Sequence, residues 1–224
     1  MCHLEVAKNL INETVKKSSD FDCSYYFSEL REIGQQEGLD DEVKKYISLV
    51  SDIACYHFVP NDKNEPYVAY IVMNTGRSAV PDDLIEKDCD LLVEICDSLE
   101  SPLLQARIND VLWLKQRKVD SAKKAISLYL QCANETFDLK NWVGSSEYIE
   151  RSLRLASLFR KKEPKLAEGV ANILIGWIQE NYKEDQLYLT AKSITLLLDF
   201  GYGDSKEMLN ITSVPTLNRT NSTA

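Results

Sequence analysis

Apolar residues recur every three or four positions along most of the chain, which is the spacing of amphipathic α-helices rather than of strands. The first three predicted helices cover residues 3–17, residues 23–37 and a segment that follows a cap at Asp40 or Asp41. After a break in the pattern, helices are predicted over residues 82–99, 102–117, 120–135, 141–162, 164–181 and 185–200.

The links between the later helices are only two to six residues long, so consecutive helices must run antiparallel. We therefore expect an all-α fold, an antiparallel bundle or α-solenoid-like stack of about nine helices. Their lengths resemble those of tetratricopeptide repeats, but the Trp-Leu-Gly-Tyr and Ala-Pro signature of that repeat is missing. The resemblance is one of architecture only.

The same pattern predicts the domain organisation. Residues 1–57 form an amino-terminal helical subdomain and residues 82–202 a helical-repeat-like domain. Between them, residues 58–81 hold three of the six prolines and are predicted to be an irregular connector with one extended segment. Residues 203–224 lack periodicity and are predicted to be a polar tail.

Two helices carry apolar residues around most of their circumference and are expected to be central. One runs from Leu103 to Leu114, and the other from Leu166 to Ile178. In the second, Gly169 and Gly176 lie seven residues apart on one side. We expect them to let a neighbouring helix come close.

Arg107 and Asp110 interrupt the apolar surface of the 102–117 helix, so both charges are expected to be partly buried. Because a buried charge is costly without a partner, and a spacing of three places the two side by side, we predict a structural ion pair. The alternative is a guanidinium that binds a carboxylate or phosphate ligand in a groove.

The composition, with 44% hydrophobic and 27% charged residues, is that of a globular protein. The longest nearly apolar run, Val170–Ile178, is too short for a bilayer, and the acidic start is no secretory signal. We therefore expect a cytoplasmic protein with no membrane contact.

Charge is unevenly spread along the chain. Residues 1–114 have 10 Lys and Arg against 22 Asp and Glu, a net charge of −12. Residues 115–165 have 12 against six, a net charge of +6. The acidic half disfavours nucleic acid as a partner. The basic segment either faces the acidic half within one molecule or binds an acidic partner.

A basic stripe is predicted on and just after the 141–162 helix. Its default interpretation is a solvated face; binding of an acidic partner is the alternative, with RNA a weaker one. The stripe consists of Arg151, Arg154, Lys161 and Lys162, with Lys165 just beyond.

No catalytic constellation is recognisable. The two histidines have no Ser or Cys with a supporting acid at a known spacing, and no glycine-rich phosphate loop occurs. The six cysteines form no CxxC pair, so reduced core thiols are expected; Cys2–His3 and Cys55–His57 are the weak alternatives for a zinc site. We expect a non-enzyme without cofactor or metal.

Three stretches carry a resemblance to a known family: GRSAVPDDL at residues 76–84, ARINDVLW at residues 106–113, and AISLYL at residues 125–130 with ERSLRLA at residues 150–156. They resemble a bacterial domain family of unknown function. That domain commonly forms the amino-terminal helical part of larger proteins. The carboxy-terminal half of those proteins is similar to the endoplasmic reticulum membrane-associated RNA degradation protein. The resemblance implies an all-helical fold and assigns no activity.

Together these observations predict a non-enzymatic helical scaffold that docks a protein partner, or its own missing carboxy-terminal domain, along the 102–162 helices. The alternative is an accessory factor in RNA metabolism or phage defence whose active part is that missing domain. The sequence leaves open the oligomeric state and whether the chain is a truncated form of a longer protein.

Overall fold

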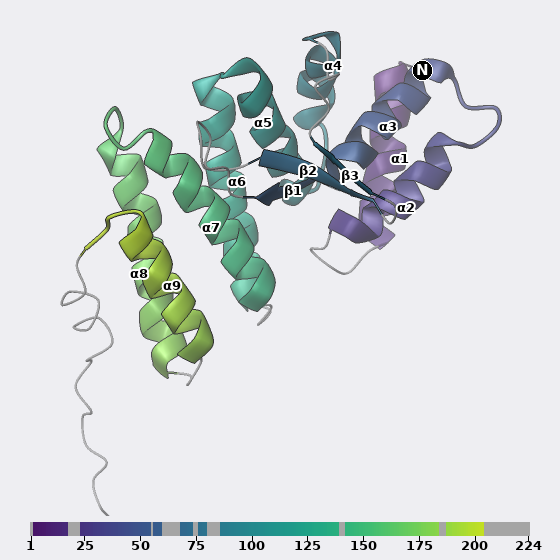
Figure 1. The fold of residues 1–224 in the computed structure, drawn as a ribbon. Coiled ribbons are helices and arrows are strands. Elements are labelled where there is room, and N and C mark those ends of the chain that lie inside the picture. The colour runs from purple at the N-terminus through teal and green to yellow at the C-terminus, as the bar shows by residue number, and fades with distance from the viewer. Residues whose placement is uncertain are drawn as a thin grey trace, which may run out of the picture. The chain divides into compact units, whose positions relative to one another are not determined.

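The computed structural model of the chain describes residues 2–17, 23–54, 56–59, 68–73, 76–79, 86–138, 142–183 and 187–203 (Figure 1). It divides into two compact units, Met1–Ser152 and Leu153–Ala224. The predicted polar tail beyond Gly203 and the predicted helix start at residues 82–85 lie outside the described residues.

The described residues contain nine helices, which confirms the predicted stack of helices. Most predicted bounds agree with the observed ones to within a few residues. The helices are α1 (His3–Lys17), α2 (Cys23–Gly34), α3 (Asp41–Ala54), α4 (Glu86–Cys96), α5 (Pro102–Gln116), α6 (Val119–Asp138), α7 (Trp142–Leu158), α8 (Pro164–Lys183) and α9 (Leu187–Asp199).

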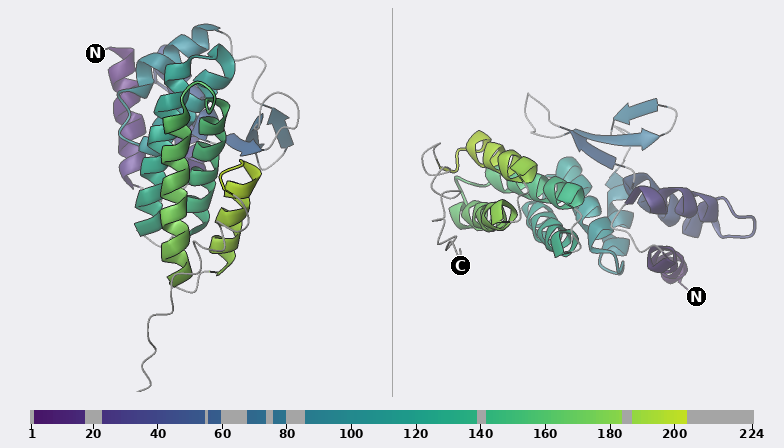
Figure 2. Two further views of the ribbon diagram at one scale, coloured as in Figure 1. Left: turned by 90° about the vertical axis from the view of Figure 1, so that its left-hand side faces the viewer. Right: turned by 90° about the horizontal axis from the view of Figure 1, so that it is seen from below.

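A three-stranded antiparallel sheet stands where an irregular connector was expected. Its strands are β1 (Tyr56–Val59), β2 (Val68–Met73) and β3 (Gly76–Ala79), in the order β1-β2-β3, with Tyr56 opposite Ile71 and Met73 opposite Gly76 (Figure 2). The sequence pointed to the apolar run of β2 alone. A strand of four residues is too short to show an alternation of apolar and polar positions. Which strands pair depends on contacts between segments and cannot be inferred from either strand alone.

In the first unit, α3 packs against α1 and α2 through the face that its periodicity predicted. Val43, Ile47 and Val50 are buried there. Asp40 caps the helix: its Oδ1 accepts a hydrogen bond from the Glu42 N–H at 2.9 Å and lies 2.8 Å from Nδ1 of His3. The bond from Glu42 is the main cause that lowers the pKa of the Asp40 carboxyl, as expected for a helix cap.

Helix α5 is the buried centre of this unit, as predicted. It packs against α3, α4 and α6, and every residue from Leu103 to Leu112 except Gln105 is buried. Ser101 caps its first turn by accepting from the Leu104 N–H at 3.3 Å. It ends at Arg117, which adopts a left-handed conformation (φ 56°) so that its N–H reaches the Trp113 carbonyl at 2.9 Å.

In the second unit, α8 and α9 lie side by side (Figure 2). Buried residues occupy one face of α8, namely Ala167, Val170, Ala171, Leu174 and Ile178. The expectation for the two glycines is wrong, because Gly169 and Gly176 are exposed and a Cβ built on either would meet nothing within 4 Å. They fall on the opposite side from the buried stripe, where no described helix approaches.

None of the described helices combines the length and the apolarity needed to cross a bilayer.

The open surroundings of these glycines lead to a stability prediction. Gly169→Ala and Gly176→Ala should each raise the free energy of unfolding by about 0.5–1 kcal/mol, because alanine loses less backbone entropy in a helix and has room for its methyl group. Urea unfolding followed by circular dichroism at the helical band measures the change.

Gly201→Ala is the matched control. Gly201 has φ 67° and ends α9 with the Tyr202 N–H bonded to the Leu197 carbonyl at 2.8 Å. A Cβ there would lie 3.3 Å from Nη1 of Arg160. This substitution should destabilise the protein, and a similar gain at all three glycines would contradict the assignment of Gly169 and Gly176 to open surface.

Candidate functional site

Asp110 of α5 is the centre of a buried polar cluster in the first unit. Its carboxylate is completely buried and accepts two hydrogen bonds from Arg151 of α7, from Nε to Oδ2 at 2.6 Å and from Nη2 to Oδ1 at 2.5 Å. Arg151 is itself only 3% exposed. This bidentate geometry is the strongest that a carboxylate and a guanidinium can form.

Tyr129 of α6 completes the cluster. Its hydroxyl donates to Oδ2 of Asp110 at 3.3 Å, and its ring stacks on that of Tyr148 of α7 at a centroid distance of 6.2 Å. Burial, and then the negative charge of Asp110, raise the pKa of the Tyr129 phenol well above its usual value. The phenol therefore stays protonated and remains a donor, so that α5, α6 and α7 all meet at one carboxylate.

Arg107 was predicted to be the partner of Asp110; the bidentate partner that the structure gives Asp110 is Arg151, 41 residues away. Arg107 donates from Nη1 to the Ala54 carbonyl at the end of α3, at 3.4 Å, and its Nη2 lies 3.9 Å from the carboxylate of Glu147. Three residues of helix turn two side chains about 60° apart, so Arg107 can reach the end of α3 and Glu147 of α7 while Asp110 meets Tyr129 of α6 and Arg151 of α7. Burial of both residues was predicted correctly; the role of Arg151 was missed.

The predicted basic stripe does not exist as one exposed surface. Arg151 belongs to the core, which corrects its assignment to the stripe. Arg154 is half-buried, and its guanidinium lies over the ring of Phe200 at 4.8 Å. These two arginines are engaged within the protein because a planar guanidinium can both pair with a carboxylate and stack on a ring.

Arg160, which the sequence did not single out, holds the end of α9. It donates to the Phe200 carbonyl at 2.9 Å and to the Gly201 carbonyl at 3.0 Å, and it lies over the ring of Tyr202 at 4.4 Å. These carbonyls directly follow the carboxyl end of α9, where the partial negative charge of the helix dipole favours a cation. In the sequence Arg160 is only one more basic residue, and nothing beside it indicates its role at the end of α9.

What remains of the stripe is a set of three lysines, Lys161, Lys162 and Lys165, which we call the basic turn. All three are exposed at the link between α7 and α8. No ion pair or side-chain hydrogen bond among the described residues involves them. The turn is ordered by backbone bonds from the Lys162 and Glu163 N–H groups to the Phe159 carbonyl, at 2.8 and 2.7 Å.

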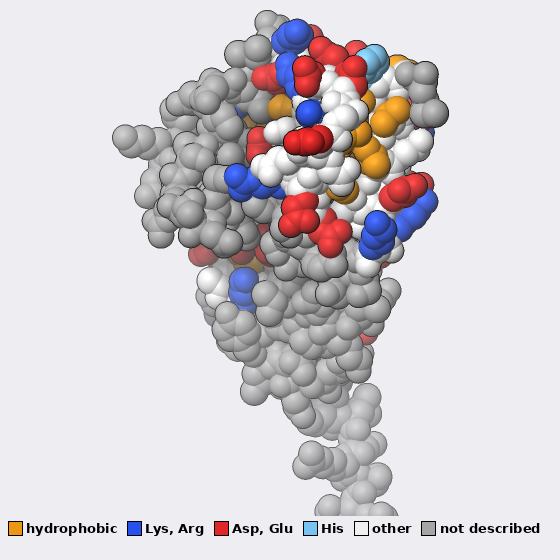
Figure 3. Space-filling model, turned by 90° about the vertical axis from the view of Figure 1, so that its right-hand side faces the viewer, with side chains coloured by type: hydrophobic (Ala, Val, Ile, Leu, Met, Phe, Trp, Pro, Cys, Tyr) orange, Lys and Arg blue, Asp and Glu red, His pale blue; other side chains and the backbone are white. Residues whose placement is uncertain are grey.

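Other charged side chains form ion pairs within the first unit. Lys124 pairs with Asp97, and Lys16 lies 2.9 Å from Glu100. On the face shown in Figure 3, acidic and basic side chains are interspersed around a small apolar patch. The pairs Lys124–Asp97 and Arg151–Asp110 join the basic segment to the acidic half, as one of the two interpretations of the charge pattern expected.

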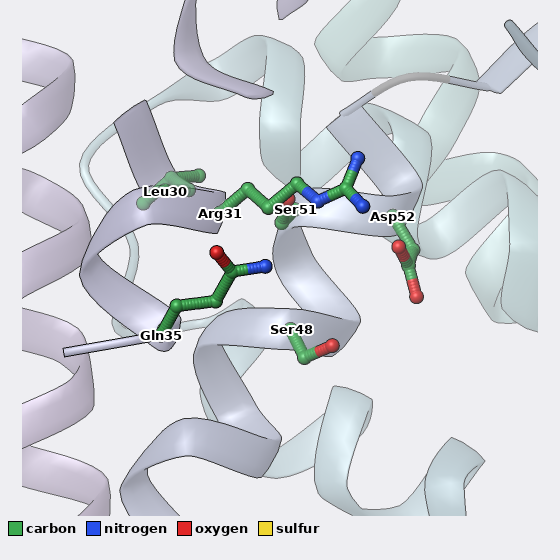
Figure 4. A pocket seen from close by; sticks show the side chains of 7 residues that line it. Leu30, Arg31, Gln35, Ser48, Ser51 and Asp52 are labelled. Atoms are coloured by element: carbon green, nitrogen blue, oxygen red, sulfur yellow. The ribbon is translucent and has the colours of Figure 1, made fainter. Parts of the chain in front are cut away.

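A cavity of about 280 Å³ opens between α2 and α3, and no pattern in the sequence indicates it. The positions that line it follow helical spacing, with small or polar residues where two apolar faces would otherwise meet. Its lining residues are Leu30, Arg31, Gly34, Gln35, Ser48, Ser51 and Asp52 (Figure 4).

The described residues contain no group of three or more His, Cys, Asp or Glu side chains that could hold a metal ion. Of the two weak zinc candidates, His3 lies against Asp40, and Cys55 lies outside the described residues. Cys89, Cys96 and Cys132 are buried thiols outside any disulfide, whereas Cys2 is exposed.

The model of a family described as domain of unknown function (DUF7380) matches residues 5–168. The chain belongs to this family. The DUF7380 match includes the Asp110 cluster, the α2–α3 cavity and the basic turn, and it ends within the first turns of α8. It confirms the expectation of a family without an assigned function. No curated protein and no solved structure matches the chain.

The buried cluster predicts an unequal response to the loss of two carboxylates. Asp110→Ala should lower the free energy of unfolding by about 3–5 kcal/mol, because it leaves Arg151 buried without its carboxylate. Asp97→Ala, the control, removes a carboxylate that is 71% exposed, and it should cost no more than about 1 kcal/mol.

The double variant Asp110→Leu with Arg151→Met distinguishes the electrostatic contribution of the ion pair from the contribution of the volume that its side chains fill. It should recover much of the stability, since apolar residues of similar volume can replace a buried ion pair. Equal losses for Asp110→Ala and Asp97→Ala in urea would show that Asp110 is not buried as described.

Proposed function

We propose that this chain is a non-enzymatic helical interaction domain that docks an acidic protein surface through the basic turn. The observation that carries the proposal is that Lys161, Lys162 and Lys165 are exposed cations outside the ion pairs of the described residues. The arginines beside them are engaged in holding the fold. Charge on the turn is therefore available to a partner without breaking an internal contact.

The contacts that hold the basic turn in place favour a role of its lysines in binding a partner over simple solvation. Arg160 ties the start of the turn to the end of α9, and two backbone bonds close the turn on Phe159. Cations on a fixed backbone lose less freedom on docking than cations on a mobile segment, which improves affinity. Charges at the rim of an interface act mainly on the rate of association.

The absence of enzymatic activity is part of this proposal. Both oxygens of Asp110 are occupied by Arg151 and Tyr129, and the cluster is closed to water, so it offers a substrate no acid or base. The proposed partner is an acidic protein surface. A separate domain of the kind that the family resemblance implies would be a special case of such a partner.

Charge reversal at the basic turn tests the proposal. The variant Lys161→Glu, Lys162→Glu, Lys165→Glu should weaken association by about tenfold or more at low ionic strength, and the difference should shrink as salt is added. The purified tagged chain is used to retain proteins, and each retained protein is then purified and its binding measured by interferometry.

The matched control reverses three exposed lysines elsewhere, Lys17→Glu, Lys87→Glu and Lys118→Glu, with the same change of net charge. A partner that loses affinity for the first variant alone supports the proposal. Equal effects of both variants would mean that only net charge matters, and retention unaffected by either would exclude the basic turn.

The same variants address the alternative of an accessory factor in RNA metabolism or phage defence. Lysines on a turn could contact phosphates, although the net charge of −9 opposes binding to nucleic acid. Fluorescence anisotropy with a single-stranded RNA at low salt measures this directly. Binding that the basic-turn variant abolishes would replace the protein partner with RNA.

A further inference from the structure

The cavity between α2 and α3 has walls of opposite charge. Arg31 is supplied by α2 and Asp52 by α3, and in Figure 4 the Arg31 side chain extends past Ser51 toward Asp52. Ser48, Ser51 and Gln35 are polar residues of the lining, and Leu30 is its apolar residue. The cavity therefore offers a cation, an anion and several neutral hydrogen-bonding groups within one small volume.

The cavity exists because small residues face one another. Gly34 has no side chain, and a Cβ there would already touch Ile47 at 3.5 Å, while Ser48 and Ser51 are short. A volume of about 280 Å³ corresponds to roughly nine water molecules. This is at the lower end of ligand sites and suits a molecule of roughly ten non-hydrogen atoms.

The two charges restrict what can bind. A simple anion attracted by Arg31 would meet the carboxylate of Asp52, and a simple cation attracted by Asp52 would meet the guanidinium of Arg31. Burial raises the pKa of Asp52 and the positive charge of Arg31 opposes that rise, so a second cationic group would also favour the ionised carboxylate. A ligand that carries both a negative and a positive charge can pair with Arg31 and with Asp52 at the same time.

We propose that this cavity binds a small zwitterion of the size of a free amino acid, with its carboxylate on Arg31 and its ammonium group on Asp52. Arg31 is exposed, so its attraction to Asp52 is weakened by water and can be exchanged for contacts with a ligand. Ser48, Ser51 and Gln35 then contact the polar atoms of the ligand, and its side chain lies toward Leu30.

Nuclear magnetic resonance titration of the full chain tests this proposal with L-serine, L-glutamine and L-leucine as probes. Saturable shifts of the backbone amides of Gly34 and Ser51 should appear at millimolar concentration for at least one of them. Its N-acetyl derivative, which lacks the ammonium charge, and its carboxamide, which lacks the carboxylate, should each bind at least about tenfold more weakly.

Asp52→Asn tests the assignment of the ammonium site. It should remove the preference for the free amino acid over the N-acetyl derivative while the carboxamide still binds poorly. Asp90→Asn, an exposed residue of α4, serves as the control and should leave the preference intact.

The following results would overturn the proposal: no saturable shift with any probe, equal binding of a probe and its N-acetyl derivative to the unaltered chain, or an unchanged preference in Asp52→Asn. The first two are measured on the unaltered protein, so they decide the matter even if a variant fails to fold. A polyol such as glycerol that binds as well as the amino acids would also contradict it.

Discussion

A carboxylate withdrawn entirely from water must have a cation beside it, and in this protein that requirement joins distant parts of the chain. Asp110 sits on the most buried helix, and its cation comes from Arg151, 41 residues later. Tyr129 supplies a third hydrogen bond from the helix between them. Apolar packing alone tolerates small slides between helices, whereas a bidentate ion pair in a dry core fixes one register, and that register sets the positions of α5, α6 and the first part of α7.

The sequence predicted local structure well and partners poorly, for a physical reason. Periodicity, caps and short links are properties of neighbouring residues, so α1 to α9 and the cap at Asp40 could be inferred from the printed chain. The partner of Asp110 is a property of the folded state. Arg107 was the nearest cation in sequence, but the direction of a side chain around the helix axis decides which neighbour it meets.

Two other differences between the expected and the observed structure also arise because the folded state, and not the neighbouring residues, decides the outcome. The small residues Gly169 and Gly176 could equally have marked a close contact or an open surface, and only the position of the buried stripe on α8 distinguishes the two. The sheet depends on pairing between segments separated in the sequence, which no single strand of four residues reveals. Likewise the α2–α3 cavity arises from small residues on two helices, each of which is unremarkable alone.

The charged residues differ in how much stability the protein would lose if they were replaced. This difference separates the residues that maintain the fold from those that are available for binding. Neither Asp110 nor Arg151 can be replaced alone without leaving a buried charge, whereas the side chains of Lys161, Lys162 and Lys165 make no contact on which the described fold depends. Ionic strength acts on these groups differently, because a Debye length of about 8 Å at physiological salt screens exposed charges and hardly affects buried pairs. Salt should therefore modulate the basic turn strongly, the half-exposed cavity partly and the Asp110 cluster very little. Because the basic turn and the cavity belong to different units and use different lysine, arginine and aspartate side chains, a failure of either proposal leaves the other standing.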